Sequence, residues 1–278
     1  MIQLKRFIKI FILLTSIAIH GNCQNLYDLD HSKHYAEFLF QSQQYKLAAM
    51  EFERLVFMEP ASSLFQQKLI KSYRKSDQVS QGLIRIKDWY PKIIPDITLY
   101  REYAKLCLLD NRFNDLLLSI NSQTPITLSE KNYYQLSTIL LQRNWIGAES
   151  FITNTPDTTW PGFTDLCDLH SKQGGIKYRK PGLALTLSAV VPGLGKVYSK
   201  DWKDGLISFL FVATNAFQAY RGFSKNGVKS AYGWIFGSLS LGFYAGNLFG
   251  SWKSAKDYNF RSEDAIYHEI QNSIFYRF

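Results

Sequence analysis

The sequence predicts an all-α protein: an N-terminal array of antiparallel helical hairpins followed by an α-helical membrane hairpin. Small and aromatic residues recur at helical-hairpin spacing in the first part of the chain. Two long apolar segments without charge follow at 206–220 and 231–250. The formal net charge is +9 over 278 residues, and residues 176–260 alone carry 11 basic and three acidic groups. The basic excess therefore surrounds the apolar segments.

Residues 1–23 have the composition of a secretory signal peptide. Three basic residues, Lys5, Arg6 and Lys9, precede an apolar stretch of about ten residues, which is too short to span a bilayer. Cleavage is expected after Cys23. Acylation of Cys23 in a lipoprotein and an uncleaved anchor are the alternatives.

The bulk composition argues against two other classes of protein. A sequence pI near 9.3 suits a nucleic-acid-binding protein, but the cations are interleaved with apolar helices rather than with aromatic-basic loops. No nucleic acid is therefore expected as a partner. Three cysteines are too few for a disulfide scaffold. Cys107 and Cys167 either form a disulfide bridge in an oxidising compartment or are two small buried residues with free thiols.

One stretch near the N-terminus carries a repeat signature. The aromatic residue Tyr45 is followed by Ala48 three positions later, by Phe52 seven positions later and by Pro60 fifteen positions later. A small residue, Ala36, lies on the preceding predicted helix. Small residues let two antiparallel helices approach closely, and aromatics fill the space between neighbouring pairs. The pattern resembles the tetratricopeptide repeat, which implies a helical array for residues 24–175.

The same frame recurs along the chain. Phe113 lies 68 residues after Tyr45, which is two periods of the repeat, and Trp145 follows 32 residues later. Val79 begins a weaker intermediate copy. The array is either a surface for a protein partner or a self-contained helical spacer.

The joint between the two parts is rich in turn residues. A short helix is expected at 163–172, and Gly174 and Gly175 end it. The basic segment 177–181 then has the composition of a juxtamembrane segment.

The membrane module, residues 176–260, is expected to begin with a broken helix at 182–198, because Pro192 and Gly193 interrupt it. Two spans are predicted at about 204–222 and 231–250. The basic loop between them is expected on the cytoplasmic side. The tail, 261–278, is expected to form an amphipathic helix that packs on the array or lies on the lipid surface.

Small and polar residues within the module are candidates for helix packing. Glycines recur every four residues, which leaves grooves without side chains where another helix, including one of a second copy of the chain, can lie close. Two asparagines lie deepest in the apolar segments and are expected to hydrogen-bond across the hairpin. The set is Gly233, Gly237, Gly242, Gly246, Gly250, Asn215 and Asn247.

A further motif is similar to the P-G-x-G-Q-x-Y signature of small bacterial membrane-hairpin families. It consists of Pro192, Gly193, Gly195, Tyr198, Trp202 and Gly205, with Lys196 in place of the usual Gln. The resemblance implies membrane location and no known catalysis.

Together these features predict a membrane-anchored cell-envelope scaffold or adaptor whose repeats bind an envelope protein. Export directs the array to the periplasm of a bacterial cell. A small channel or transporter subunit with a regulatory repeat domain is the alternative. No catalytic residues, cofactor or metal are expected, because His31 and His34 lack an acidic or cysteine partner at usable spacing.

Overall fold

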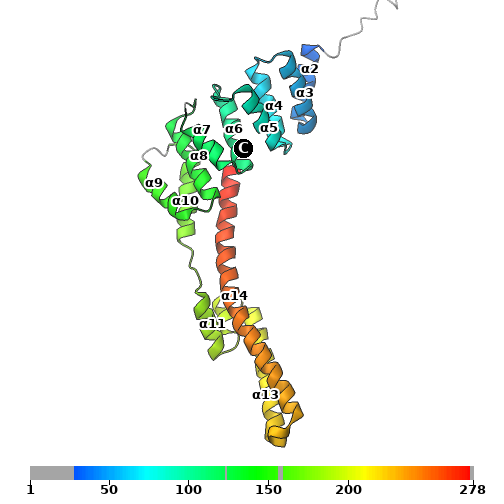
Figure 1. Cartoon of the computed structure of the whole chain (residues 1–278), viewed down its shortest axis with the longest axis vertical. Helices are drawn as coiled ribbons and strands as arrows, with labels where there is room; N and C mark the ends of the chain where they lie inside the picture. Colours follow the sequence, from blue (N-terminus) through cyan, green and yellow to red (C-terminus); the bar gives the residue numbers. More distant parts are fainter. Residues whose placement is uncertain (1–27, 123, 156–158, 276–278) are drawn as a thin grey trace, which may run out of the picture. The chain divides into compact units, whose positions relative to one another are not determined.

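The computed structural model describes residues 28–122, 124–155 and 159–275, and every regular element within these ranges is a helix (Figure 1). The predicted all-α class is confirmed. The chain divides into two compact units, residues 1–127 and 128–278. The predicted signal peptide, including Cys23, lies outside the described residues.

The first unit is a succession of antiparallel helices in which sequence neighbours pack on each other. Ala36, Ala48 and Phe52 are fully buried, as the repeat signature predicts. Tyr45 meets the ring of Phe40 edge-on, with 5.4 Å between the centroids. The helices are α2 (Leu29–Gln41), α3 (Tyr45–Met58), α4 (Ser63–Lys75), α5 (Val79–Trp89), α6 (Ile97–Leu109) and α7 (Phe113–Ile120).

One turn recurs within the helix pairs and sets the period. Each of four turns contains one residue in the left-handed conformation. These residues are Gln43, Asp77, Asn111 and Arg143, which are separated by 34, 34 and 32 residues. The N–H of the following residue bonds to the carbonyl five residues earlier, as from Gln44 to Leu39 at 2.9 Å. This Schellman geometry satisfies carbonyls that the helix end leaves free. The weak copy that begins at Val79 therefore has the same turn as the others.

The second unit begins with an antiparallel pair that a third helix covers, and these contact the C-terminal helix. Its elements are α8 (Leu128–Leu141), α9 (Trp145–Asn154), α10 (Phe163–Gly174), α11 (Pro181–Val190), α12 (Leu194–Tyr198), α13 (Trp202–Asn226), the 3₁₀ turn η1 (Gly227–Lys229) and α14 (Ala231–Phe275). The helix predicted at 163–172 and the break at Pro192-Gly193 are both present.

α14 is a single helix of 45 residues, about 67 Å long at 1.5 Å per residue. Its first part pairs with α13 and its last part packs on α8 and α10 (Figure 1). The predicted amphipathic tail is therefore the continuation of the hairpin helix, and it packs on protein. Ile270 and Ile274 are fully buried there, whereas Ala265 is exposed.

None of the helices described has both the length and the apolar character of a helix that could cross a membrane. The prediction of two membrane spans at about 204–222 and 231–250 is therefore not supported, although α13 and α14 do form the predicted antiparallel hairpin.

Candidate functional site

The glycine motif lies where α11, α12 and the start of α13 meet α14. Gly193 has a φ of +88°, and a Cβ there would lie 2.0 Å from the carbonyl oxygen of Gly205. A Cβ on Gly195 would lie 1.9 Å from the carbonyl oxygen of Ala184. Backbone thus packs directly on backbone, and no other residue type fits these two positions. The structure brings together the motif glycines that the sequence singled out.

A chain of buried hydrogen bonds closes this junction. The Asn247 Oδ1 accepts from the Gly193 N–H at 3.0 Å, and the Ser188 Oγ accepts from the Gly195 N–H at 2.9 Å. Ser251 donates to the Asn247 carbonyl, so Ser188 supplies the proton of the 2.6 Å bond between the two serine hydroxyls. These acceptors satisfy N–H groups at the start of α12 that no helix carbonyl can reach.

The predicted hydrogen bond between Asn215 and Asn247 does not form. The Asn215 Nδ2 donates to the Phe211 carbonyl of its own helix at 2.7 Å, and the residue is half-buried. The ring pair Phe211–Phe243 shows the register of the hairpin. In that register Asn215 is level with residue 239, so Asn247 lies about 12 Å farther along α14. The prediction was wrong because the sequence did not show the register.

The glycines of α14 separate into three groups by what they face. Gly233 and Gly237 lie against α13, where a Cβ on Gly233 would meet the Phe223 ring at 2.8 Å. Gly250 lies against the Lys196 side chain. A Cβ on Gly242 or Gly246 would meet nothing within 4 Å. One predicted groove is thus filled within the chain, and the other is open around Gly242 and Gly246.

The remaining motif residues lie at the edge of the junction. The Tyr198 hydroxyl accepts from the Lys180 N–H at 3.2 Å. Trp202 is the first residue of α13 and is exposed, and Pro192 lies in the break between α11 and α12. Lys196, the motif's departure from the family pattern, donates to the Ser208 Oγ at 2.9 Å, a contact that sequence reasoning missed.

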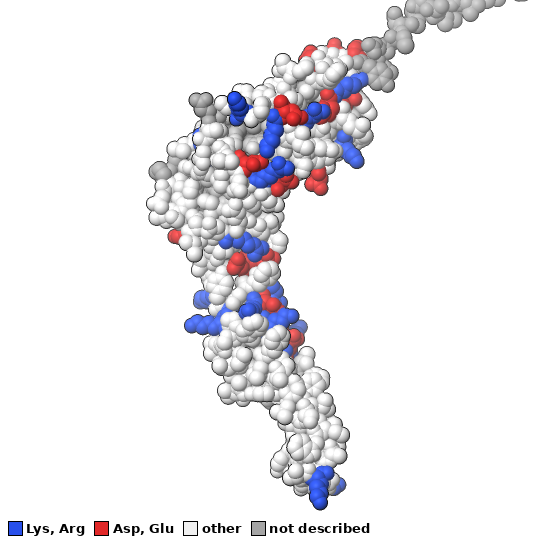
Figure 2. Space-filling view, viewed as in Figure 1, with Lys and Arg blue, Asp and Glu red and all other residues white. Residues whose placement is uncertain are grey.

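The hairpin carries a large exposed apolar surface. Residues 205–220 and 230–252 contain no charged side chain, and Figure 2 shows an uncharged stretch with cations beyond its tip. Many large apolar side chains there face outward, among them Phe217, Ile235 and Leu241, the last of which is 70% exposed. Monomeric soluble proteins rarely expose contiguous apolar patches larger than a few hundred Å².

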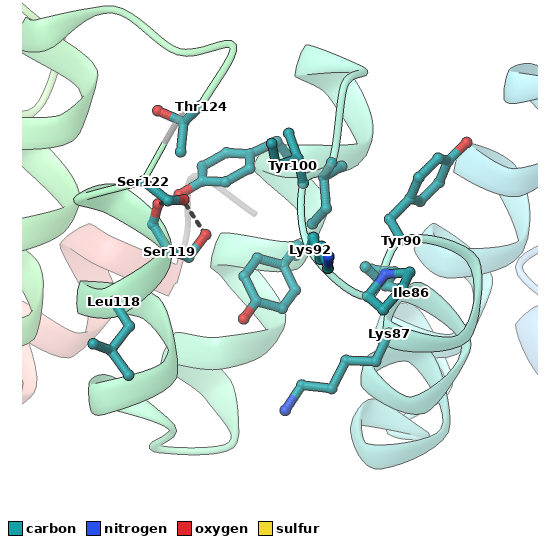
Figure 3. A pocket seen from close by; sticks show the side chains of 13 residues that line it. Ile86, Lys87, Tyr90, Lys92, Tyr100, Leu118, Ser119, Ser122 and Thr124 are labelled. Atoms are coloured by element: carbon teal, nitrogen blue, oxygen red, sulfur yellow. Dashed lines mark hydrogen bonds between the residues drawn. The ribbon is translucent and has the colours of Figure 1, made fainter.

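A cleft of about 510 Å³ opens in the first unit between the α5–α6 connection and α7 (Figure 3). Its apolar side is formed by Ile86, Ile94 and Tyr100, and the Ser119 hydroxyl donates to the Tyr100 hydroxyl at 3.0 Å. Lys92 adds a positive charge, and the buried Thr124 Oγ1 has no hydrogen-bond partner among the described residues. The cleft therefore combines apolar contact area with polar groups.

A buried ion pair holds the first unit together near this cleft. The Arg74 Nε lies 2.6 Å from the Glu102 carboxylate, and Lys105 approaches the same carboxylate at 3.2 Å. Burial acts to raise the pKa of Glu102, but the hydrogen bonds and charges of Arg74 and Lys105 outweigh it, so the pKa is lowered. This cluster is structural.

The two cysteines that the structure describes are free thiols, so the alternative of a bridge is not realised. Burial raises the pKa of Cys107 to about 12.

His31 pairs with Asp28 at 2.7 Å, and no group of three or more potential metal ligands gathers within the described ranges. The chain matches no known protein-family model, and no match to it was found among curated proteins or solved structures.

Proposed function

We propose that this protein is a membrane-anchored adaptor of the bacterial cell envelope. The α13–α14 hairpin inserts its apolar surface into lipid, and the helical array binds a protein partner. The observation that carries the proposal is the contrast between the uncharged, outward-facing apolar hairpin and the charged surface of the array.

Lipid is the environment that suits this surface. Burial of apolar area is worth roughly 25 cal/mol per Å², so leaving many large side chains in water is costly. The uncharged stretch 230–252 extends about 33 Å along α14, and a bilayer has a hydrocarbon core of about 30 Å. Arg221, Lys225 and Lys229 at the tip match the preference of cations for lipid head groups.

The helical array offers a cleft in which a partner protein can bind. The cleft beside α7 has the apolar area, hydroxyl groups and positive charge that suit an extended segment of a partner with an acidic residue. The signal peptide predicted from the sequence implies that this cleft faces the periplasm. α14 runs without interruption from the hairpin to α8 and α10, so it connects the anchor to the last helices of the array.

Flotation of the purified full-length protein with neutral phosphatidylcholine vesicles tests the anchor. We expect the wild type to float and to resist an alkaline carbonate wash. Replacing Phe217, Ile235, Leu241 and Phe249 by Ser removes apolar area without opening the core, because each is more than half exposed. We expect this variant to stay at the bottom of the gradient. A wild type that fails to float would overturn the proposal.

The matched control replaces four exposed apolar residues of the array by Ser. Met50, Phe57, Ile84 and Ile146 are likewise more than half exposed. We expect this variant to float like the wild type, because none of these side chains belongs to the hairpin. Equal loss of flotation in the two variants would show that general surface apolarity, and not the hairpin, is responsible.

The partner site is tested by placing a photo-crosslinking amino acid at Leu118, which lines the cleft (Figure 3), and at Phe57 on α3 as the control. In intact cells we expect one discrete crosslinked species from position 118 and none from position 57. The same species from both positions, or none from either, would count against the cleft as the binding site.

A further inference from the structure

The junction of α10 and α11 holds an arginine whose position is fixed but whose charge is not neutralised. The Arg179 N–H donates to the Asn259 Oδ1 at 2.7 Å, and the Arg179 carbonyl accepts from the Asn259 Nδ2 at 2.8 Å. Both bonds involve the arginine backbone. The side chain at position 179 can therefore be changed without disturbing this clamp.

The Arg179 guanidinium lies between two tyrosine rings. Its Cζ is 4.9 Å from the Tyr198 ring centroid and 5.4 Å from that of Tyr258. Stacking on aromatic faces holds the planar group and reduces the freedom it loses when it binds a ligand. The Arg179 Nε is buried and has no hydrogen-bond partner in the part of the chain that the structure describes.

A second cation shares the site. The Lys200 Nζ lies 5.7 Å from the centroid of the same Tyr258 ring. No carboxylate among the described residues forms an ion pair with Arg179 or Lys200. Burial acts to raise the pKa of Tyr258, but the Ser262 hydrogen bond and the charges of Lys200 and Arg179 outweigh it and lower the pKa. The site therefore holds two cations at one tyrosine ring, and neither is in an ion pair with a carboxylate of the described residues.

The site lies at the edge of the uncharged surface of the second unit, and this position indicates its ligand. Arg179 precedes α11 by two residues and Lys200 precedes α13 by two, so both lie where the uncharged surface begins. Exposed Trp202 begins α13, two residues after Lys200, and half-buried Trp252 ends the uncharged stretch of α14, with Lys256 over the Trp252 ring at 3.7 Å. Aromatic and basic residues at one level are typical of the interface between lipid and water.

We propose that Arg179 and Lys200 bind the phosphate of an anionic phospholipid head group. The inference rests on the proposed function, because it requires the hairpin to lie in lipid. The guanidinium supplies paired N–H donors to the phosphate oxygens and Lys200 supplies a point charge. The acyl chains then follow the exposed apolar side chains of α11 and α13, such as Leu183 and Leu206.

The test compares flotation with phosphatidylcholine vesicles and with vesicles that also contain phosphatidylglycerol. We expect wild-type partitioning to rise about tenfold or more with the anionic lipid, because each near-surface cation is worth roughly 1 kcal/mol. The double variant R179Q/K200Q is expected to lose most of this preference and to keep its binding to neutral vesicles. Arg179→Lys is expected to be intermediate, since the charge stays and the planar donor pair is lost.

The matched control is K253Q/K256Q, which removes the same charge from the lysines that flank the uncharged stretch of α14. We expect it to keep most of the preference for phosphatidylglycerol. Equal losses in the two double variants would overturn the inference in favour of diffuse attraction. Native mass spectrometry in neutral detergent supplies a second readout. We expect the wild type to retain one phosphatidylglycerol molecule that inorganic phosphate does not displace. We expect R179Q/K200Q to retain none. Displacement by phosphate would identify a general anion site and overturn the lipid assignment.

The two proposals fail in different ways. A wild type that binds neutral vesicles without preferring anionic ones refutes the lipid site and leaves the anchor intact. A wild type that binds no vesicle refutes the anchor.

Discussion

The side-chain oxygen of Asn247 on α14 accepts a hydrogen bond from the backbone N–H of Gly193, 54 residues earlier, at 3.0 Å. This bond joins the helical hairpin to the break between α11 and α12. It gives the Oδ1 of Asn247, a residue only 3% exposed, a partner, whereas the buried Nδ2 has none among the described residues.

Asn247→Ala removes the oxygen that accepts the Gly193 N–H and leaves that buried N–H without its partner. We expect a loss of about 1–3 kcal/mol in unfolding free energy. Asn215→Ala is the control, because Asn215 is half-buried and its amide donates to a carbonyl of its own helix. Thermal unfolding in detergent, followed by circular dichroism, measures both. Equal shifts in the two variants would contradict the role of Asn247.

Gly193→Ala and Gly195→Ala place a Cβ about 2 Å from a backbone carbonyl oxygen, and Gly193 also has a positive φ. Neither backbone can move without opening the junction, so we expect a loss of about 3 kcal/mol or more, or failure to fold. Gly242→Ala and Gly246→Ala are the controls, because a Cβ there meets nothing within 4 Å. We expect these two to be neutral or to gain up to about 1 kcal/mol from higher helix propensity. Melting temperatures in one detergent rank the four variants.

Glu102→Gln leaves the Arg74 guanidinium buried with its charge uncompensated. Both side chains are less than a tenth exposed, so we expect a loss of about 3–5 kcal/mol. Asp115→Asn breaks the exposed pair with Lys87 and is expected to cost at most about 1 kcal/mol. Hydrogen exchange of α4 and α6 in the full chain reports the difference. Comparable protection in the two variants would contradict a structural role for the buried pair.

The lowered pKa of Glu102 predicts an acid-side loss of stability. Its ordinary value is 4.5, and the folded state holds it lower, so the folded state is stabilised whenever the pH lies above 4.5. The stabilisation declines as the pH falls through the interval between 4.5 and the folded value. We therefore expect the difference in exchange protection of α4 and α6 between wild type and Glu102→Gln to be constant from pH 7 to 5 and to shrink below pH 4.5. A difference that stays constant to pH 3 would refute the linkage.

Arg143→Ala is expected to loosen the end of α14. The Arg143 Nη2 lies 2.5 Å from the Asp264 carboxylate, and the guanidinium lies 3.9 Å from the Tyr267 ring centroid. Losing both contacts is expected to speed amide exchange of residues 262–275 several-fold. Lys172→Ala is the control, because its pair with Glu269 is longer and more exposed. Unchanged exchange in Arg143→Ala would show that the apolar contacts of Ile270 and Ile274 hold this end alone.

Local patterns in the sequence predicted the elements but not their partners. The burial of Ala48 and Phe52 follows from their spacing, because helical periodicity places them on one face of α3, and Ala36 is the small residue expected on the preceding helix α2. The break at Pro192 and Gly193 follows from the chemistry of those two residues. The Schellman turns at Gln43 and Arg143 gave no signal, because residues that rarely adopt the left-handed conformation occupy it there.

The sequence by itself determined the helical class, the period of the hairpins and the uncharged hairpin near the C-terminus, because each depends on residues close together along the chain. Only the tertiary structure decided that Asn247 bonds to Gly193, that Gly233 packs inside the hairpin while Gly242 stays open, and that the tail continues α14 onto α8 and α10. These relationships depend on the register between segments many residues apart. Register is set by packing, and periodicity within one segment does not specify it.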